Sequence, residues 1–455
     1  MAKSFDRRSF LGATAGLAGL GLMTPAAFPL VAGHARPRTQ PGPRPVPPNS
    51  RIGIALIGCG KRMFEMLGPL ADHPDLQIRG VCDVDATRRT EAGNRIVERM
   101  RRRALDAGGA LADAGIAEFV DHRELIAMPG VDAVVICTPD HWHADQVLDA
   151  AAAGKDIYCE KPLTQCLHEC RAMIEAVRKH GVVFQTGSQQ RTEYDHRFVR
   201  ACELVRAGKI GKVLSVHVGV ADPPVACDLA GEAPEPGLEW DRWLGPAPWR
   251  EYNAELSPRG VHNHYPTWRN YKEYCGGYLA DMGAHHFDIA QWGLGLDASG
   301  PARVEPPEMG DRAGIGGQLP MRGATLVTPD GVRIIHGGPS GTTFVGTEGI
   351  IAVDRGRIAS VPGNILDAEL GEDERLPRKA SHIQDWVDCM RSRERCICDV
   401  EIGARSAALC HLMNLAYEHR RTLHWDAAAW RFRGDDAANA WLERDRREGY
   451  ALPAW

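Results

Sequence analysis

The sequence predicts a two-domain α/β protein, with a parallel, doubly wound sheet first and an α+β domain second. From residue 52 to residue 186, short apolar segments alternate with helical stretches, which is the pattern of βα units. After about residue 213 the alternation ends. Strands joined by tight turns then follow, and we expect them at 324–328, 332–336, 343–346 and 349–353.

The bulk composition is that of an ordinary globular protein. The chain has 455 residues, which is enough for two domains or more. Hydrophobic residues make up 44% and charged residues 25% of it. With a net charge of −5, the chain has no basic excess that would attract nucleic acid or an anionic membrane surface, so we predict no nucleic-acid partner.

The N-terminus has the features of a twin-arginine export signal. The stretch DRRSFLG at 6–12 places two arginines before an Ala/Gly/Leu-rich run, and small residues near Ala27 or Ala35 offer cleavage points. We therefore predict a signal over 1–35, a periplasmic or otherwise exported location, and no membrane span after its removal. Residues 36–50 are rich in proline and predict an extended arm or linker.

A glycine-containing turn opens the first predicted domain, which spans 51–186. The apolar strand 52–57 runs into Gly58, Cys59, Gly60, Lys61 and Arg62, and a helix follows. Glycines between a strand and a helix let backbone N–H groups approach a pyrophosphate at the helix N-terminus. We therefore predict that these five residues bind a dinucleotide in a Rossmann domain, although Met63 stands where a third glycine is usual.

The next strand, 77–84, suggests which dinucleotide this is. It carries Asp83 near its end, where a carboxylate can hold a ribose 2′-hydroxyl and would repel a 2′-phosphate. This favours NAD, while Arg88 and Arg89 nearby leave NADP possible.

Polar residues also follow the later strands of this domain. The strands at 131–137, 156–159 and 182–186 end near one edge of the predicted sheet, which is where open α/β sheets bind ligands. Besides the glycine turn and Asp83, the predicted cofactor-binding residues are Thr138, Pro139, His141, Trp142, His143, Glu160, Lys161 and Gln189.

The second predicted domain spans 187–455, and its segment 222–274 is rich in aromatic residues. Aromatic faces flanked by hydrogen-bonding groups suit a carbohydrate, although an aromatic packing region between the sheet and its loops gives the same pattern. The predicted substrate-binding residues are Arg191, Trp268, Arg269, Tyr274 and His286.

A helix predicted from about residue 279 carries the residues best suited to proton transfer. Asp281, His285, Asp288 and Trp292 fall on one helical face. A carboxylate one turn from an imidazole can orient it and tune its basicity. The same pattern also fits a half-buried helix whose polar side chains are only satisfied.

Cysteines and histidines do not indicate a metal. The thirteen cysteines include no CxxC pair, and we expect them to be reduced, buried core residues. The histidines at 141, 143, 262 and 264 lack carboxylate or thiolate partners at ligand spacing, so we predict no metal site.

Several motifs together resemble the glucose–fructose oxidoreductase/inositol dehydrogenase family, known as Gfo/Idh/MocA. The most specific are Glu160-Lys161-Pro162 and Asp281-x-Gly283-x-His285-x-x-Asp288. Two further stretches, CTPDHWHA at 137–144 and FVGTEGIIAVDRG at 344–356, resemble the exported branch of that family.

The resemblance implies a Rossmann domain followed by an α+β domain whose open, mostly antiparallel sheet commonly forms the dimer interface, and hence a homodimer or homotetramer. It implies a sugar, polyol or sugar derivative as the small-molecule substrate. It also implies that Lys161, Asp281 and His285 are catalytic. In these roles His285 takes the substrate hydroxyl proton, Lys161 stabilises the oxygen, and Asp281 orients the histidine or a second hydroxyl.

Three functions remain open from the sequence. Because little free nicotinamide cofactor is found outside the cytoplasm, an exported oxidoreductase implies tightly bound, self-recycling NAD(P). Alternatively, transient oxidation of a ring carbon would serve an NAD-dependent glycosidase, lyase or epimerase. A non-catalytic nucleotide- or sugar-binding protein is the third possibility.

Overall fold

The computed structural model describes residues 50–106, 108, 115–308 and 322–453. The predicted export signal and all of the proline-rich arm except Ser50 lie outside the described residues. Within the described ranges, no helix is both long enough and apolar enough to cross a membrane.

The first sheet is parallel and doubly wound, as predicted. Its strand order is β3-β2-β1-β4-β5-β6, so the order reverses between β1 and β4, where such sheets bind their ligands. The strands are β1 (Ile52–Ile57), β2 (Leu76–Cys82), β3 (Ala117–Phe119), β4 (Ala133–Ile136), β5 (Asp156–Cys159) and β6 (Phe184–Thr186).

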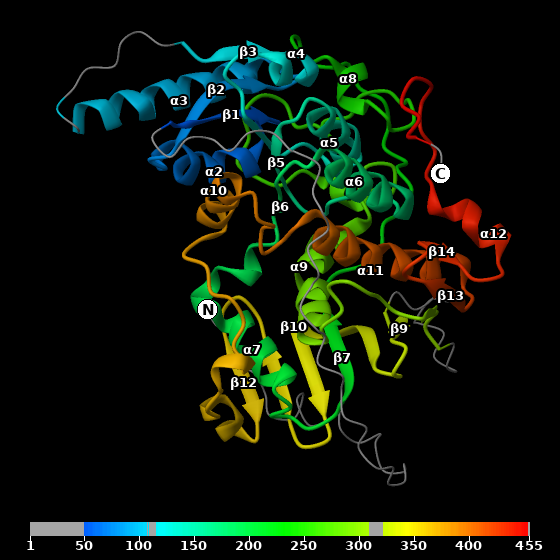
Figure 1. Cartoon of the computed structure of the whole chain (residues 1–455). Helices are drawn as coiled ribbons and strands as arrows, with labels where there is room; N and C mark the ends of the chain where they lie inside the picture. Colours follow the sequence, from blue (N-terminus) through cyan, green and yellow to red (C-terminus); the bar gives the residue numbers. More distant parts are fainter. Residues whose placement is uncertain (1–49, 107, 109–114, 309–321, 454–455) are drawn as a thin grey trace, which may run out of the picture. The chain divides into compact units, whose positions relative to one another are not determined.

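Helices cover both faces of this sheet (Figure 1). They are α2 (Lys61–Asp72), α3 (Ala86–Asp106), α4 (His122–Ala127), α5 (His143–Ala152) and α6 (Leu167–His180). Successive β1 side chains enter two different cores. Ile54 packs in the cluster that contains α2 residues, and Ala55 packs in the cluster that contains α5 and α6 residues. Burial on both faces explains why β1 and β4 are continuously apolar.

The second sheet has eight strands, and its strand pairs are antiparallel, which confirms the predicted fold class. Its order is β12-β11-β10-β9-β8-β13-β14, with β7 paired to β10. The strands are β7 (Val213–Gly219), β8 (Arg303–Glu305), β9 (Thr325–Val327), β10 (Arg333–Gly346), β11 (Ile350–Val353), β12 (Ile358–Val361), β13 (Leu423–Asp426) and β14 (Arg431–Phe432).

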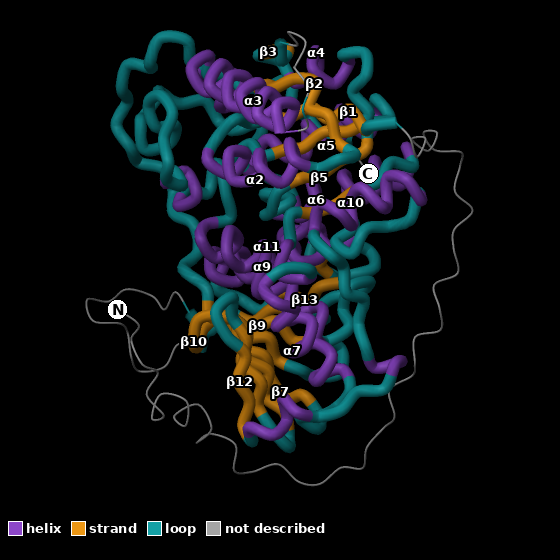
Figure 2. The backbone as a smooth tube through the Cα atoms, turned by 90° about the vertical axis from the view of Figure 1, so that its left-hand side faces the viewer, coloured by secondary structure: helices purple, strands orange, loops and turns teal. Residues whose placement is uncertain are grey.

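Two long helices of the second half, α9 (Gly277–Gly293) and α11 (Val400–His419), lie between the two sheets (Figures 1 and 2). They pack against each other; α9 contacts β7 and β10, and α11 contacts β6. The predicted catalytic helix is therefore held on several sides. The remaining helices are α7 (Arg197–Arg206), α8 (Trp240–Leu244), α10 (His382–Ser392) and α12 (Asp436–Asn439).

All thirteen cysteines are free, and eleven of them are buried, which agrees with the prediction of reduced core residues. Burial raises the pKa of Cys59, Cys137 and Cys159 well above the ordinary thiol value, so these thiols are held in their neutral form.

Candidate active site

The glycine turn has the geometry that a pyrophosphate needs. Gly58 has a φ of +88°, and an added Cβ there would lie 2.7 Å from the backbone nitrogen of Thr138. Gly60 caps the N-terminus of α2, and an added Cβ there would meet nothing within 4 Å. This free space faces the pocket that Gly60 lines, so the turn fits a phosphate group approaching the helix N-terminus.

Met63, in the place of a third glycine, does not obstruct the turn. Its side chain is buried in the core beneath α2, where it packs with Leu56 and Leu67. The helix therefore approaches the sheet through an apolar side chain instead of through a glycine.

Asp83 lies beside the glycine turn, as the spacing predicts. Its carboxylate accepts hydrogen bonds from the backbone N–H groups of Cys59 at 2.6 Å and Asp85 at 2.9 Å. Burial raises the pKa of Asp83, while Arg88 and these hydrogen bonds act in the opposite direction. Asp83 also lines the pocket, so it can meet a ribose hydroxyl there.

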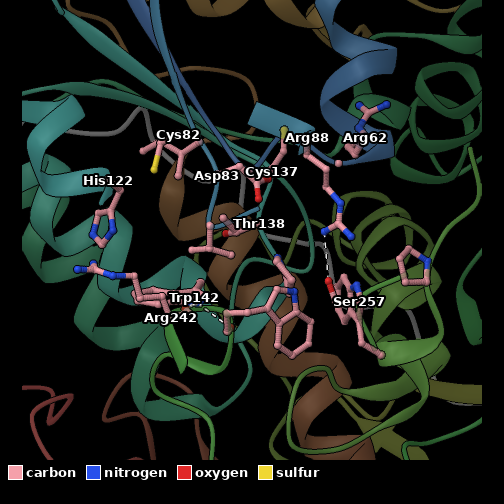
Figure 3. A pocket seen from close by; sticks show the side chains of 18 of the residues that line it. Arg62, Cys82, Asp83, Arg88, His122, Cys137, Thr138, Trp142, Arg242 and Ser257 are labelled. Carbon is pink, nitrogen blue, oxygen red and sulfur yellow. Dashed lines mark hydrogen bonds between the residues drawn. The ribbon is translucent and has the colours of Figure 1, made fainter. Parts of the chain in front are cut away.

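One pocket follows the carboxyl ends of β1, β2, β3 and β4 (Figure 3). Its empty volume, open mouth included, is about 990 Å³, which is at the upper end of the range for cofactor pockets. Of the predicted cofactor-binding residues, Gly58, Gly60, Lys61, Arg62, Asp83, Thr138, Pro139 and Trp142 line it.

A segment of the second half covers this pocket, and we call residues 256–269 the lid segment. Its members Leu256, Ser257, Pro258, His262, Tyr265, Pro266, Trp268 and Arg269 line the pocket. Two hydrogen bonds tie the segment to α2: Lys61 Nζ donates to Asn263 Oδ1 at 2.9 Å, and the Tyr265 hydroxyl donates to Glu65 at 2.6 Å.

Arg88 of α3 is a third connection to the lid segment. Its Nη1 donates to Ser257 Oγ at 3.2 Å and its Nε to the Gly260 carbonyl at 3.1 Å, and its Nη2 donates to the Pro258 carbonyl (Figure 3). The guanidinium is buried and its donors are directed at the lid segment. Arg89 likewise donates to the Asp83 carbonyl at 2.7 Å.

The turn Glu160-Lys161-Pro162 follows β5 and is held from several sides. Glu160 accepts hydrogen bonds from Arg62 at 2.8 Å and from Gln189 at 3.0 Å. The His143 ring faces the Pro162 carbonyl at 2.8 Å and the Thr138 carbonyl at 3.0 Å. Glu160, Gln189 and His143 do not line the pocket. Their hydrogen bonds hold the turn that carries Lys161.

Lys161 forms an ion pair with Asp281 of α9. Its Nζ lies 2.9 Å from Asp281 Oδ1 and 2.8 Å from the Asp281 carbonyl oxygen. Arg269 Nε also donates to Asp281 Oδ1, at 3.3 Å, and Arg269 lines the pocket. Burial alone would raise the pKa of Asp281, but Lys161 and Arg269 lower it below its ordinary value. Asp281 is therefore a carboxylate held between two cations.

His285 lies one helical turn after Asp281 and is buried. Burial, together with the nearby charges of Lys161 and Arg355, lowers the pKa of His285 well below its ordinary value. Its Nδ1 is buried without a hydrogen-bond partner among the described residues. A neutral imidazole beside an ammonium group can accept a proton at neutral pH, as a general base must.

Asp140 adds a carboxyl group to this region that the sequence did not single out. It is buried at 2% exposure, and its Oδ2 has no hydrogen-bond partner in the described structure. Burial raises the pKa of Asp140 to about 7, and the charge of Asp281 adds to that shift.

Three residues expected to contact substrate lie elsewhere. Arg191 is 1% exposed and forms ion pairs with Asp288 and Asp297, both at 2.7 Å. Tyr274 is fully buried in the aromatic cluster of Trp243 and Trp268. His286 is buried, and its Nδ1 lies 3.2 Å from the Thr342 hydroxyl. None of the three residues lines the pocket, because each side chain is engaged in the protein core.

Two predicted cofactor residues are also placed in the protein interior. The His141 ring is buried, with Nε2 2.9 Å from the Trp243 carbonyl, and burial lowers the pKa of His141 to about 3. The Cys59 thiol is buried beneath the glycine turn, so only its backbone takes part there. Of the predicted substrate-binding residues, Trp268 and Arg269 line the pocket.

Several pocket residues have no motif in the sequence. They are His122, Arg123, Arg242 and Tyr450, which come from three distant stretches of the chain. Only the helix start at Asp121 could have directed attention to His122. Nothing local distinguishes Arg242 or Tyr450 from other surface residues.

Comparisons with known proteins agree with this architecture. Residues 52–188 match the family model described as oxidoreductase family, NAD-binding Rossmann fold, and residues 228–452 match the model described as oxidoreductase family, C-terminal alpha/beta domain. The chain is 26% identical over 327 residues to the uncharacterized oxidoreductase YrbE of Bacillus subtilis, covering 70% of this chain and 78% of that protein.

Two named dehydrogenases are also similar. The scyllo-inositol 2-dehydrogenase (NAD(+)) of Bacillus subtilis is 42% identical over 40% of this chain and 42% of its own length. The myo-inositol 2-dehydrogenase of Thermotoga maritima is 27% identical over 56% of this chain and 65% of its own length. The match thus spans less than two thirds of either dehydrogenase.

Among solved structures, the aldose-aldose oxidoreductase of Caulobacter crescentus superposes with a TM-score of 0.53 at 18% identity, covering 82% of this chain and 100% of that one. At this identity the likeness concerns the fold alone. The family models, in contrast, together match most of the chain, in both domains. The chain therefore belongs to the Gfo/Idh/MocA oxidoreductase family.

Proposed function

We propose that the protein is an NAD-dependent oxidoreductase that acts on a hydroxyl group of a sugar, polyol or sugar derivative. The observation that carries the proposal is the Lys161–Asp281 ion pair with the neutral His285 one turn further along α9. Arg269 links this group to the pocket, because it contacts Asp281 and lines the pocket as well.

Each of the three residues has a role that its environment supports. His285 accepts the proton of the substrate hydroxyl, because burial keeps its imidazole neutral. Lys161 donates a hydrogen bond to the same oxygen and stabilises the negative charge that develops on it. Asp281 holds the Lys161 ammonium in position at 2.9 Å. The bound nicotinamide supplies the acceptor for the hydride that leaves the carbon.

We further propose that NAD is preferred over NADP. Asp83 lies where a ribose hydroxyl is expected, and its carboxylate disfavours a phosphate there. The two arginines that left NADP possible are both engaged: Arg88 with the lid segment, and Arg89 with the Asp83 carbonyl. The scyllo-inositol 2-dehydrogenase among the relatives, whose name specifies NAD, supports this preference.

The lid segment supports tight retention of the cofactor. Its hydrogen bonds to Lys61, Glu65 and Arg88 must break before the pocket can open over the glycine turn. Slow release suits the proposed export, since an exported enzyme cannot draw on a cytoplasmic pool of NAD. Such an enzyme recycles its cofactor within each catalytic cycle, either with a second carbonyl substrate or by oxidising and reducing the same sugar.

The test is to purify the protein, identify nucleotide released by denaturation, and incubate the protein with inositols, aldoses, sugar acids and aryl glycosides. We expect bound NAD, and reduction of that NAD by at least one polyol or sugar, seen as near-ultraviolet absorbance. Product formed without net reduction would favour the redox-neutral route. A protein that binds neither NAD nor NADP and converts no member of the panel contradicts the proposal.

A further inference from the structure

Residues 443–450, near the C-terminal end of the described chain, form an anchored segment that we call the C-terminal strap. Arg444 and Arg446 form ion pairs with Glu169 of α6, at 2.7 and 2.6 Å, and Arg446 also pairs with Asp145 of α5. Glu169 is fully buried. Burial would raise the pKa of Glu169, but the two arginines and the Gln165 backbone N–H lower it, so the carboxylate stays charged.

The strap delivers one aromatic side chain to the pocket. Arg446 Nε donates to the Tyr450 carbonyl at 2.6 Å, and the Arg447 guanidinium lies 5.7 Å from the Tyr450 ring centroid. The Tyr450 ring meets the Trp142 ring edge-on, with centroids 5.7 Å apart and an interplanar angle of 84°. Tyr450 is half-buried and lines the pocket.

The surroundings of Tyr450 identify which end of the pocket this is. His122 follows β3 and Trp142 follows β4, and their rings are 5.6 Å apart. Arg242 lines the pocket beside them, and Figure 3 shows His122, Trp142 and Arg242 together, away from Arg62 and Ser257. Lys161 follows β5, on the far side of β4 from β2 and β3, and does not line this pocket. On the proposed function Lys161 faces the nicotinamide, so the end of the pocket at His122 and Trp142 is the one that takes the adenine.

The geometry points to Tyr450 as an adenine-binding residue, held in place by the arginines of the C-terminal strap. This inference rests on the proposed function, since it requires a dinucleotide in the pocket. Aromatic rings and arginine guanidinium groups are the side chains on which a base stacks. Anchoring to a buried carboxylate fixes the ring before the ligand arrives, which lowers the entropy that binding must overcome.

The test separates the two ends of the cofactor. NAD, ADP-ribose and nicotinamide mononucleotide are titrated into nucleotide-free protein, and affinity is measured from the quenching of tryptophan fluorescence. Tyr450→Ala is compared with Tyr450→Phe, which keeps the ring. Trp249→Ala is the matched control, because Trp249 is an aromatic residue at 65% exposure that does not line the pocket.

We expect Tyr450→Ala to weaken NAD and ADP-ribose roughly tenfold, as loss of one base–aromatic contact does. Nicotinamide mononucleotide should bind as it does to the unchanged protein, and Tyr450→Phe and the control should retain normal affinity for all three. Unchanged ADP-ribose affinity in Tyr450→Ala, or an equal loss for all three ligands, overturns the inference. If the unchanged protein binds neither NAD nor ADP-ribose, the proposed function itself is wrong.

Discussion

The side chains of the site differ in charge, because burial raises the pKa of an acid and lowers the pKa of a base. Burial keeps His285 neutral and raises the pKa of Asp140 to about 7, whereas Asp281 stays ionised because Lys161 and Arg269 contact it. A neutral base, a charged acid and a carboxyl group that titrates near neutral pH thus lie in one small region.

Asp140 makes the stability of the fold depend on pH. Its pKa in the folded protein, about 7, lies above the value of about 4 in an unfolded chain. Between these values the folded state holds more protons, so stability falls as pH rises through this window. Asp140→Asn removes the effect.

We therefore expect the free energy of unfolding of the unchanged protein to fall relative to that of Asp140→Asn as pH rises from about 4 to about 7. The change should reach up to about 1.4 kcal/mol per pH unit. Urea unfolding at several pH values in this window measures it. Parallel pH profiles for the two proteins would show that Asp140 titrates normally.

Arg191 illustrates what a residue type alone leaves undecided. A guanidinium two positions after Gln189 suited substrate binding, but in the fold it faces Asp288 and Asp297 and lies 4.8 Å from the Trp292 ring centroid. The helical spacing predicts Asp288 on the same face as His285. Its ion pair with Arg191 can be recognised only in the folded structure, where the segment after β6 meets α9.

Among the elements, α9 depends on close packing along its whole length. An added Cβ at Gly293 would lie 2.6 Å from two ring atoms of the fully buried Phe344, and one at Gly283 would lie 3.0 Å from Cys410 Sγ. Glycine at these positions lets the helix approach the second sheet and α11.

Gly293→Ala should therefore destabilise the protein by about 1–3 kcal/mol, the usual cost of overpacking a core. Chemical denaturation measures the change in the free energy of unfolding. Gly363→Ala is the control, because an added Cβ there meets nothing within 4 Å, and it should be nearly neutral. Equal stability of Gly293→Ala and Gly363→Ala would mean that α9 is less tightly held than its contacts indicate.

The sequence predicted elements well where the periodicity was uninterrupted. It placed α9 and every strand of the first sheet except β3 within a few residues, because their apolar spacing is regular. It split β10 into two strands, whereas Gly337, Gly338 and Gly341 have positive φ and the register shifts there while the strand continues.

Other differences have local causes. The sequence predicts a helix from residue 194 to residue 207, whereas α7 begins at Arg197, because residues 194–196 have φ between +53° and +61°. The sequence does not predict strands β3, β8, β12, β13 and β14; each has two to four residues, too few for a recognisable alternation.

For the whole molecule, the site combines parts that are far apart in the chain. The glycine turn and Asp83 follow strands of the first sheet. The ion pair between Lys161 and Asp281 joins the turn after β5 to α9. Residues of the lid segment and Tyr450 of the C-terminal strap also line the pocket. Motifs predicted the first two parts. The covering parts depend on tertiary contacts, such as Arg88 with Ser257 and Arg446 with Glu169, that no local pattern specifies.

Lys161→Met tests the central claim most directly. Arg269 remains beside Asp281 in this variant, so the carboxylate is not left unpaired and folding should be retained. Lys212→Met, at an exposed lysine outside the pocket, is the matched control.

The measurement is the rate at which a polyol or sugar found in the substrate screen reduces the bound NAD, together with the nucleotide content of each protein. We predict equal nucleotide content in all three proteins and a rate in Lys161→Met at least about 100-fold below the other two, as for loss of a group that stabilises developing charge. Reduction of the cofactor by Lys161→Met at the rate of the unchanged protein would contradict the assignment of Lys161, Asp281 and His285 as the catalytic group.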